Sequence, residues 1–309
     1  MQSRNPLPCV TTAMMVLAMV VAGQAGGLAA PASAQEAAGT DVAQLGIFDR
    51  LRGGGRRGGN CMDPSASSDQ DVRRNSAAIS NARLCVTQDS VTDGGLTWRF
   101  TIVSSRARGP VWYMPHDDET QAFDAAIYAV ARYGGRLVAV DGNERRQYRG
   151  IDGNRHFARD RSAAARCGMR GPSTNYTRFV MGQFRGQRHV LSIHNNTRGG
   201  GVSVNMRSAK NTGFRARGRF SDPDHLVFIA GKQPIASSRE GQTWRDRLLR
   251  AGLNVVYEHV TPRNNDCSMS NYVALNDGRP YFNIEAVHGS RIQKGMVDAL
   301  MAMLGYRPR

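Results

Sequence analysis

The sequence contains very little lysine. Only Lys210, Lys232 and Lys294 occur among its 41 basic residues, so the formal net charge of +16 comes almost entirely from arginine. Guanidinium groups bind carboxylates and phosphates through paired hydrogen bonds, which favours an anionic partner. A codon bias toward arginine would produce the same composition without such a partner. The charge therefore indicates solubility and nonspecific association more than a specific site.

The chain also lacks a run of about 20 apolar residues, the length that a helix needs to cross a bilayer. Its apolar segment 14–22 is shorter, follows Arg4 and precedes the small-residue sequence Ala-Ser-Ala at 32–34. This pattern predicts a secretory signal peptide over residues 1–34. We therefore expect no transmembrane segment and a periplasmic or secreted mature protein.

Cysteine is scarce, and no C-x-x-C pair of the zinc-ribbon kind is present. Cys9 lies within the expected signal peptide, which leaves Cys61, Cys85, Cys167 and Cys267 in the mature chain. In an oxidising compartment an even number of cysteines favours disulfides over metal ligation, and four cysteines allow three pairings. The simplest pairing joins Cys61 to Cys85 and Cys167 to Cys267.

The composition changes along the chain and indicates its organisation. Residues 35–60 are rich in alanine, glycine and arginine and predict a flexible linker. Residues 61–94 predict an N-terminal extension packed on the core, and residues 95–309 predict the main, catalytic domain. No repeat with a period of 20 to 50 residues occurs.

Apolar periodicity predicts an α/β domain. Strands are expected at 96–103, 111–114, 137–140, 189–193, 225–229, 253–257 and 281–284. Helices are expected at 120–133, 174–184, 239–250 and 293–303. Continuously apolar strands are buried on both faces, so the fold should be a mixed, mostly parallel central sheet with helices on both faces.

Polar residues that follow directly on these strands are the candidate functional residues, because ligands gather at the carboxyl ends of such strands. His116 and Glu119 follow one strand, His194 another and Glu285 a third. Two histidines and a carboxylate can hold a catalytic Zn²⁺, and a further carboxylate can move a proton. Each histidine alone would more often be structural. The pair at 258–259, Glu-His, also ends a predicted strand and could compete for the metal or the base role.

The motifs resemble the zinc carboxypeptidase superfamily, including its succinylglutamate desuccinylase-like branch. They are H-x-x-E at His116 and Glu119, Ser-x-His at Ser192 and His194, and a glutamate near the C-terminus. Between the two ligand motifs that superfamily carries an Asn-Arg pair within D-x-N-R-x-F, and residues 152–157 read Asp-Gly-Asn-Arg-His-Phe. The resemblance covers roughly residues 95–305.

The resemblance implies one Zn²⁺ per chain, held by His116, Glu119 and His194. It also implies that Glu285 is the general base and acid, and that the fold is zinc carboxypeptidase-like. Absence of metal would instead indicate a noncatalytic, arginine-rich module that binds cell-wall polymer or another polyanion.

Substrate binding is assigned by the same resemblance to Asn154 and Arg155, which would hold a carboxylate of the substrate. His288, three residues after the general base, would be either structural or a support for the site. Family members commonly have glycine after the first histidine, whereas Asp117 and Asp118 stand here. We expect both aspartates to be solvated or to lie at a helix N-terminus.

The sequence thus predicts a secreted zinc-dependent amide hydrolase acting on a carboxylate-bearing peptide. A peptidoglycan stem peptide would fit an exported enzyme, and a deacylase of N-acyl amino acids is the alternative enzyme. Nucleic-acid binding has only the charge in its favour, because no recognisable nucleic-acid-binding motif is present. The oligomeric state does not follow from the sequence.

Overall fold

The computed structural model describes residues 61–309 except 170–173, 207 and 288. The expected signal peptide (1–34), the expected linker (35–60) and His288 lie outside the described residues. No helix in the described part of the chain is both long enough and apolar enough to span a bilayer.

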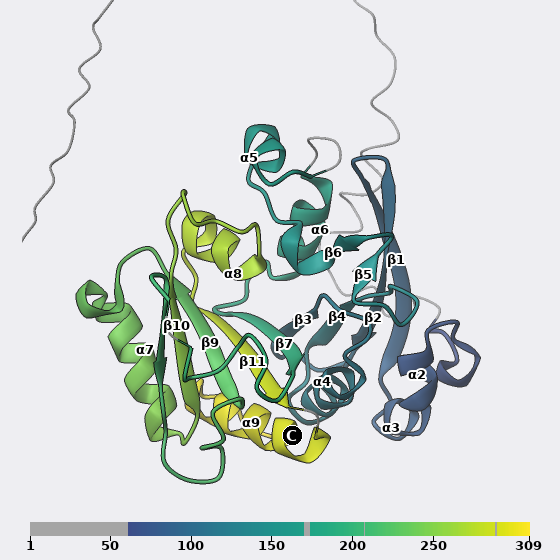
Figure 1. Ribbon diagram of the computed structural model, residues 1–309. Helices are drawn as coiled ribbons and strands as arrows, with labels where there is room; N and C mark the ends of the chain where they lie inside the picture. The colour runs from purple at the N-terminus through teal and green to yellow at the C-terminus, as the bar shows by residue number, and fades with distance from the viewer. Residues whose placement is uncertain (1–60, 170–173, 207, 288) are drawn as a thin grey trace, which may run out of the picture. The chain divides into compact units, whose positions relative to one another are not determined.

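A nine-stranded mixed sheet forms the centre of the fold (Figure 1). Its strand order is β1 (Cys85–Asp93), β2 (Leu96–Ser104), β4 (Arg136–Val140), β3 (Val111–Met114), β7 (Val190–Asn196), β11 (Tyr281–Val287), β9 (Leu226–Gly231), β10 (Asn254–His259) and β8 (Asn211–Phe214). Neighbours are parallel from β4 to β11 and between β9 and β10, and antiparallel elsewhere. The prediction of an α/β fold with a mixed sheet is confirmed.

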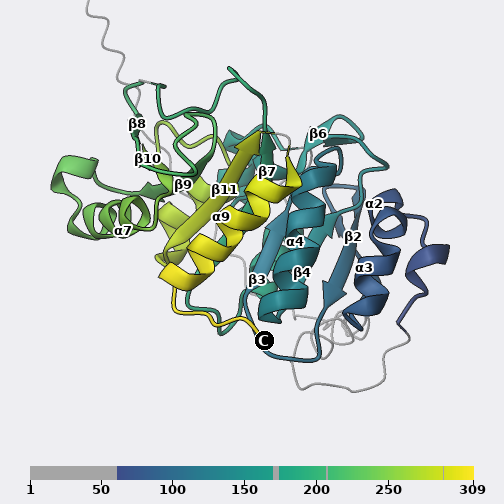
Figure 2. The same ribbon diagram turned by 90° about the horizontal axis from the view of Figure 1, so that it is seen from below.

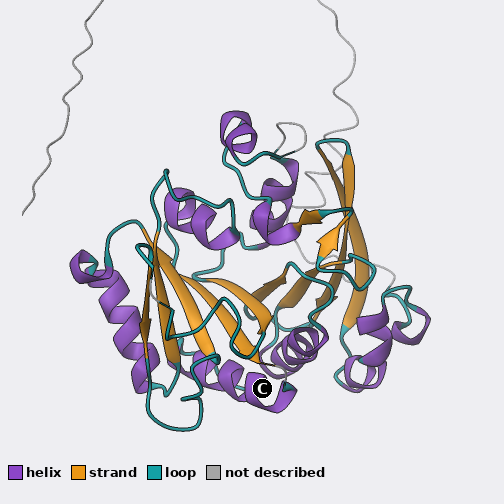
Figure 3. Ribbon diagram, in the orientation of Figure 1, coloured by secondary structure: helices purple, strands orange, loops and turns teal. Residues whose placement is uncertain are grey.

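Helices cover both faces of the sheet (Figures 1 and 3). The longer ones, α4 (Thr120–Tyr133), α7 (Arg239–Arg250) and α9 (Ser290–Met303), lie on one face, which Figure 2 shows from below. The other face carries α6 (Asn175–Gln183), α8 (Met269–Tyr272) and the π-helical turn Val273–Asp277. Short elements complete the fold: Pro64–Ala66, β5 (Gln147–Tyr148), β6 (Ile151–Asp152), Gly153–Arg155, α5 (Arg161–Arg166) and Ile235–Ser237.

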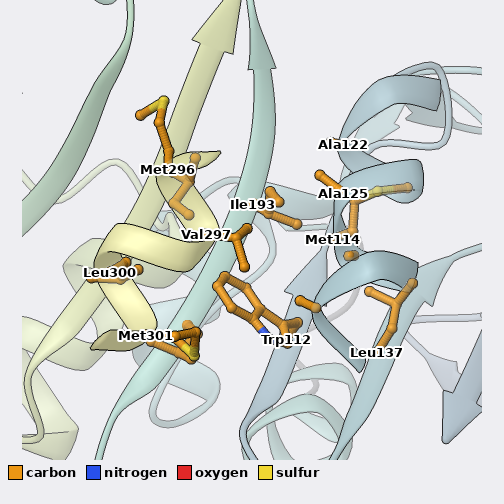
Figure 4. Close-up of a cluster of buried hydrophobic side chains, with 14 of the residues drawn as sticks. Trp112, Met114, Ala122, Ala125, Leu137, Ile193, Met296, Val297, Leu300 and Met301 are labelled. Carbon is orange, nitrogen blue, oxygen red and sulfur yellow. The ribbon is translucent and has the colours of Figure 1, made fainter. Parts of the chain in front are cut away.

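The apolar character of β3 follows from its burial on both faces. Trp112 and Met114 pack toward α4 and α9 (Figure 4), whereas Val111 and Tyr113 pack toward α6. Successive side chains of a strand point to opposite faces, so a strand between two helical layers is apolar at every position. This places the residues after β3 at an edge of a rigid, two-sided core.

Residues 61–94 contribute α2 (Gln70–Arg74), α3 (Ser76–Asn81) and the edge strand β1. Val72 and Ile79 are fully buried in the same cluster as α4. The structure contains the disulfides Cys61–Cys85 and Cys167–Cys267, the pairing that chain order favours.

The strands that carry His194 and Glu285 extend further than their apolar runs. The prediction ended them before His194 and Glu285, but β7 runs to Asn196 and β11 to Val287, so both polar residues lie inside strands. A polar side chain that faces a site interrupts the apolar pattern without ending the strand. No strand was predicted between residues 199 and 220, but this region contains the short edge strand β8.

Candidate metal centre and active site

His116 and Glu119 lie on the short connection between β3 and α4, and Glu119 is the residue that precedes the helix. His194 lies in β7, which is the parallel neighbour of β3. Because parallel neighbours end at the same edge of a sheet, the two motifs meet although 78 residues separate their histidines.

The three side chains form a compact buried group. The Nδ1 atoms of His116 and His194 are 3.2 Å apart. Glu119 Oε1 lies 2.8 Å from His116 Nδ1, and Glu119 Oε2 lies 3.2 Å from His194 Nδ1. Among the described residues, this is the one group of three histidine, cysteine or acidic side chains whose ligand atoms lie close enough to hold a metal ion.

Asp152 supports this group by contacting His116 on the side away from Glu119, a role that the sequence analysis missed. Its Oδ1 lies 2.8 Å from His116 Nε2, the ring nitrogen that faces away from Glu119. A carboxylate on the far nitrogen of a histidine fixes the orientation of the ring and leaves the other nitrogen to a metal. The first residue of the D-x-N-R sequence was the available signal.

Backbone and side-chain donors hold the remaining groups in place. The Asn195 N–H donates to Glu119 Oε2 (3.1 Å), and Arg146 Nη1 donates to Glu119 Oε1 (2.8 Å). Gln293 Nε2, from α9, donates to the backbone carbonyl of His194 (2.7 Å). Each donor fixes the position of a residue whose side chain belongs to the buried group.

The charges of the group are strongly coupled. Burial alone would lower the pKa of His116, but its contacts with Asp152 and Glu119 raise that pKa to about 9. Burial would raise the pKa of Glu119, yet His194 and His116 hold it well below its usual value. The same kind of contact, with His116, brings the pKa of Asp152 to about 2 despite its burial. Both carboxylates are therefore ionised at neutral pH, and a bound cation would replace the proton on His116.

Glu285 lies beside the group without belonging to it. It is the direct cross-strand partner of His194 between β11 and β7, so the two side chains share one face of the sheet. Burial raises the pKa of Glu285, and Glu119 raises it further, while His194 and a 2.8 Å hydrogen bond from Asn283 Nδ2 oppose the rise. A carboxylate with a raised pKa next to a metal group is suited to exchanging protons.

Asn154 and Arg155 lie on the helical turn that follows Asp152. The Asn154 N–H donates to Asp152 Oδ1 (2.7 Å), so this turn is tied to the carboxylate that holds His116. Arg155 Nη2 lies 3.7 Å from Asp266 Oδ2, and the Arg155 side chain is 48% exposed. The guanidinium can therefore reach a ligand from solvent.

The competing pair, Glu258 and His259, does not join the group. Glu258 is buried and accepts hydrogen bonds from Lys210 Nζ and Asn271 Nδ2, both at 2.8 Å, and from Ser270 Oγ at 3.2 Å. Its partners include neither His116 nor His194, so Glu258 does not contribute to the candidate metal group.

No protein-family model matches the chain, and no curated protein gives a significant match. Solved structures with a similar chain trace include a metallo-carboxypeptidase from Burkholderia cenocepacia (11% identity, 75% of this chain and 68% of that chain, TM-score 0.41). An aspartoacylase family protein from Mesorhizobium loti is also similar (16% identity, 72% and 68%, TM-score 0.40). A carboxypeptidase is thus among the similar structures, as the motifs suggested.

Proposed function

We propose that the protein is a zinc-dependent hydrolase of an amide bond in a substrate that carries a free carboxylate. The observation that supports this function best is the buried group of His116, Glu119 and His194 with Glu285 on the neighbouring strand. Two imidazoles and one carboxylate are a catalytic zinc set, which leaves a fourth position for water or substrate.

The spacing of the donor atoms fits such an ion. Two nitrogens bound tetrahedrally to zinc at 2.0–2.1 Å would be about 3.3 Å apart. The Nδ1 atoms of His116 and His194 are 3.2 Å apart, and the Glu119 oxygens lie at 2.8 and 3.2 Å from them. His116 also has its far nitrogen on Asp152, the arrangement that supports metal-binding histidines.

When bound, zinc would supply Lewis acidity that polarises the scissile carbonyl and makes water a better nucleophile. Glu285 would accept the proton of the attacking water on its carboxylate and return it to the departing amine. The raised pKa of Glu285 suits both steps, because the carboxyl group can hold the proton between them. Arg146, which is half-exposed, donates to Glu119 and adds positive charge next to this ligand carboxylate.

Arg155 and Asn154 would recognise the substrate's carboxylate. The Arg155 guanidinium is accessible. Its turn is connected through Asp152 to His116, so the distance between Asn154 and Arg155 and the metal group is fixed. A fixed distance orients the scissile bond relative to Glu285. Peptides with a free C-terminal carboxylate and N-acyl amino acids both meet this requirement.

We further infer that the enzyme acts outside the cytoplasm on a cell-wall peptide such as a peptidoglycan stem peptide. Two disulfides favour an oxidising compartment. Stem peptides carry free carboxylates next to amide bonds, which suits the arginine-rich chain.

Metal content and hydrolysis, measured on the same preparations, test the proposal. We expect about one zinc per chain in the wild type and in Glu285→Gln, and loss of zinc in His116→Ala. His259→Ala is the matched control, because His259 lies outside the group and should retain the zinc. Glu285→Gln should lower the turnover of a carboxylate-bearing peptide about 10²- to 10⁴-fold. A wild type that takes up no metal on reconstitution would contradict the proposed hydrolase function and favour the noncatalytic polyanion-binding module.

A further inference from the structure

Asp117 is buried, contrary to the expectation that it is a solvated or helix N-terminal charge. It is 5% exposed, whereas its neighbour Asp118 is exposed. Asp117 Oδ2 accepts two backbone hydrogen bonds, from the N–H of Gly142 (3.0 Å) and from the N–H of Glu144 (2.6 Å). A buried carboxylate needs such partners, so the side chain and the segment around Gly142 stabilise each other.

The segment 141–146 has one specific conformation that Asp117 stabilises. Asn143 and Glu144 both have left-handed backbones, with φ of 57° and 60°. Gly142 leaves no room for a side chain, because a Cβ there would lie 2.7 Å from the carbonyl oxygen of Arg145. Consecutive left-handed residues without glycine persist only where surrounding contacts over-determine them.

Side chains from α2 and β2 hold the same segment from outside. Arg74 Nη2 donates to Glu144 Oε1 (2.5 Å). Arg99 Nη2 donates to Asn143 Oδ1 (2.7 Å) and lies 3.1 Å from Asp141 Oδ1. These partners are half-exposed, so the buried bonds to Asp117 contribute the more persistent restraint.

The segment ends at Arg146, whose Nη1 donates to Glu119 Oε1 at 2.8 Å. The same oxygen lies 2.8 Å from His116 Nδ1, and the other Glu119 oxygen accepts the Asn195 N–H. The Arg146 side chain is 52% exposed, so little packing of its own holds it in place. Its position depends on the backbone that carries it.

We propose that Asp117 is a positioning residue of the metal centre. It fixes the segment 141–146 so that Arg146 holds the Glu119 carboxylate in the orientation that a metal ion requires. The inference rests on the proposed metal function. A ligand carboxylate that is already oriented needs less rearrangement when the metal binds, and such supports commonly change metal affinity 10- to 100-fold.

Zinc affinity, measured by competition with a chromophoric chelator and without substrate, tests the proposal. We expect Asp117→Ala and Arg146→Ala each to weaken zinc binding about 10-fold. The double variant should be no weaker than either single variant, because both changes remove the same contact. Asp117→Asn should remain close to the wild type, since its amide oxygen can accept the same two N–H groups. Asp118→Ala is the matched control and should equal the wild type.

A second measurement is independent of metal and of activity. Hydrogen exchange of the Gly142 and Glu144 amides should accelerate in Asp117→Ala and remain slow in Arg146→Ala, which acts after the segment is formed. If Asp117→Ala does not fold, Gly142→Ala displaces the same segment through its clash with Arg145 and should show the zinc affinity of Arg146→Ala.

Equal zinc affinity in the wild type, Asp117→Ala and Arg146→Ala would overturn the inference. Additive losses in the double variant would overturn it too, because Asp117 would then act independently of Arg146. Neither result affects the proposed function, which fails only if the wild type binds no metal or hydrolyses no amide.

Discussion

At the scale of one residue, Arg155 combines an accessible guanidinium with a backbone that is held in place. Its guanidinium is half-exposed and 3.7 Å from Asp266, while its backbone belongs to the turn that Asp152 holds. The half-exposed side chain can therefore reach a ligand from a turn whose position is fixed. A planar guanidinium can hold a carboxylate by two hydrogen bonds, which an ammonium group cannot reproduce.

Replacing Arg155 by alanine should raise the KM for a carboxylate-bearing peptide roughly 10- to 150-fold, because a charged hydrogen bond contributes roughly 1.5–3 kcal/mol. Arg155→Lys should recover little of this loss. Steady-state kinetics would measure these changes in KM on one peptide in two forms, one with a free C-terminus and one with a C-terminal amide.

Arg159→Ala is the control for Arg155, because Arg159 is exposed, lies four residues further and pairs with Asp160. We expect no change in its KM. An equal loss by Arg155→Ala on the free and the amidated peptide would show that the arginine does not recognise the carboxylate.

At the scale of secondary-structure elements, α2 carries an unusual buried charge. Asp71 in this helix is 1% exposed, and burial raises its pKa to about 6, with Asp69 and Asp124 adding to the rise and Arg74 opposing it. Its Oδ2 has no hydrogen-bond partner within the described structure. The ionised form of Asp71 therefore destabilises the fold at neutral pH.

Asp71→Asn should stabilise the protein at pH 8 by roughly 1–3 kcal/mol. The folded-state pKa lies above the unfolded one, so ionisation costs stability progressively as pH rises from about 4 to about 6. The advantage of the variant should thus grow across this window and vanish below it. Urea unfolding at pH 4 and pH 8 measures the difference.

A constant difference between Asp71→Asn and the wild type at both pH values would contradict the assignment of the effect to ionisation. Asp89→Asn is the control, because Asp89 is an exposed aspartate on β1. The free energy of unfolding of Asp89→Asn should be nearly that of the wild type at either pH.

Adjacent strands position the candidate base. Glu285 faces the metal group because β11 and β7 pair in the register that sets it opposite His194. A shift of one residue would turn Glu285 to the opposite face, toward α4 and α9. The apolar neighbours Ile284 and Ala286, both fully buried on that face, prevent such a shift.

At the scale of the whole molecule, the disulfide Cys167–Cys267 joins segments 100 residues apart. The segment around Cys267 also contacts the turn that carries Asn154 and Arg155: the Cys267 carbonyl accepts the Phe157 N–H (3.0 Å), and the Met269 N–H donates to Asn154 Oδ1 (3.3 Å). The disulfide therefore restrains the unfolded chain and supports the turn that carries Arg155.

Cys167→Ala with Cys267→Ala should lower the free energy of unfolding by up to about 4.7 kcal/mol, from the chain entropy of a loop of roughly 100 residues. The matched double variant at Cys61 and Cys85, 24 residues apart, should lose less, about 3.5 kcal/mol. Denaturant unfolding of the two variants compares them. A larger loss at the shorter loop would contradict the loop-entropy explanation.

Much of the fold was predictable from local sequence. The helix Thr120–Tyr133 and the strand Val111–Met114 were predicted to the residue, because their apolar spacing and the two glycines after the helix act over a few residues. The mixed sheet followed from strands that are apolar on both faces. The edge strand β8 was missed, because Asn211 and Gly213 carry no apolar alternation.

The candidate site, like the fold, was predictable from the sequence only in part. The sequence by itself determined which residue types could bind a metal, since His116, Glu119 and His194 follow or end apolar runs. Only the tertiary structure decided that Asp152 contacts His116, that Asp117 is buried under Gly142 and Glu144, and that Glu258 pairs with Lys210. These partners are 25 to 48 residues apart along the chain, and their contacts depend on how strands and loops pack rather than on any local pattern.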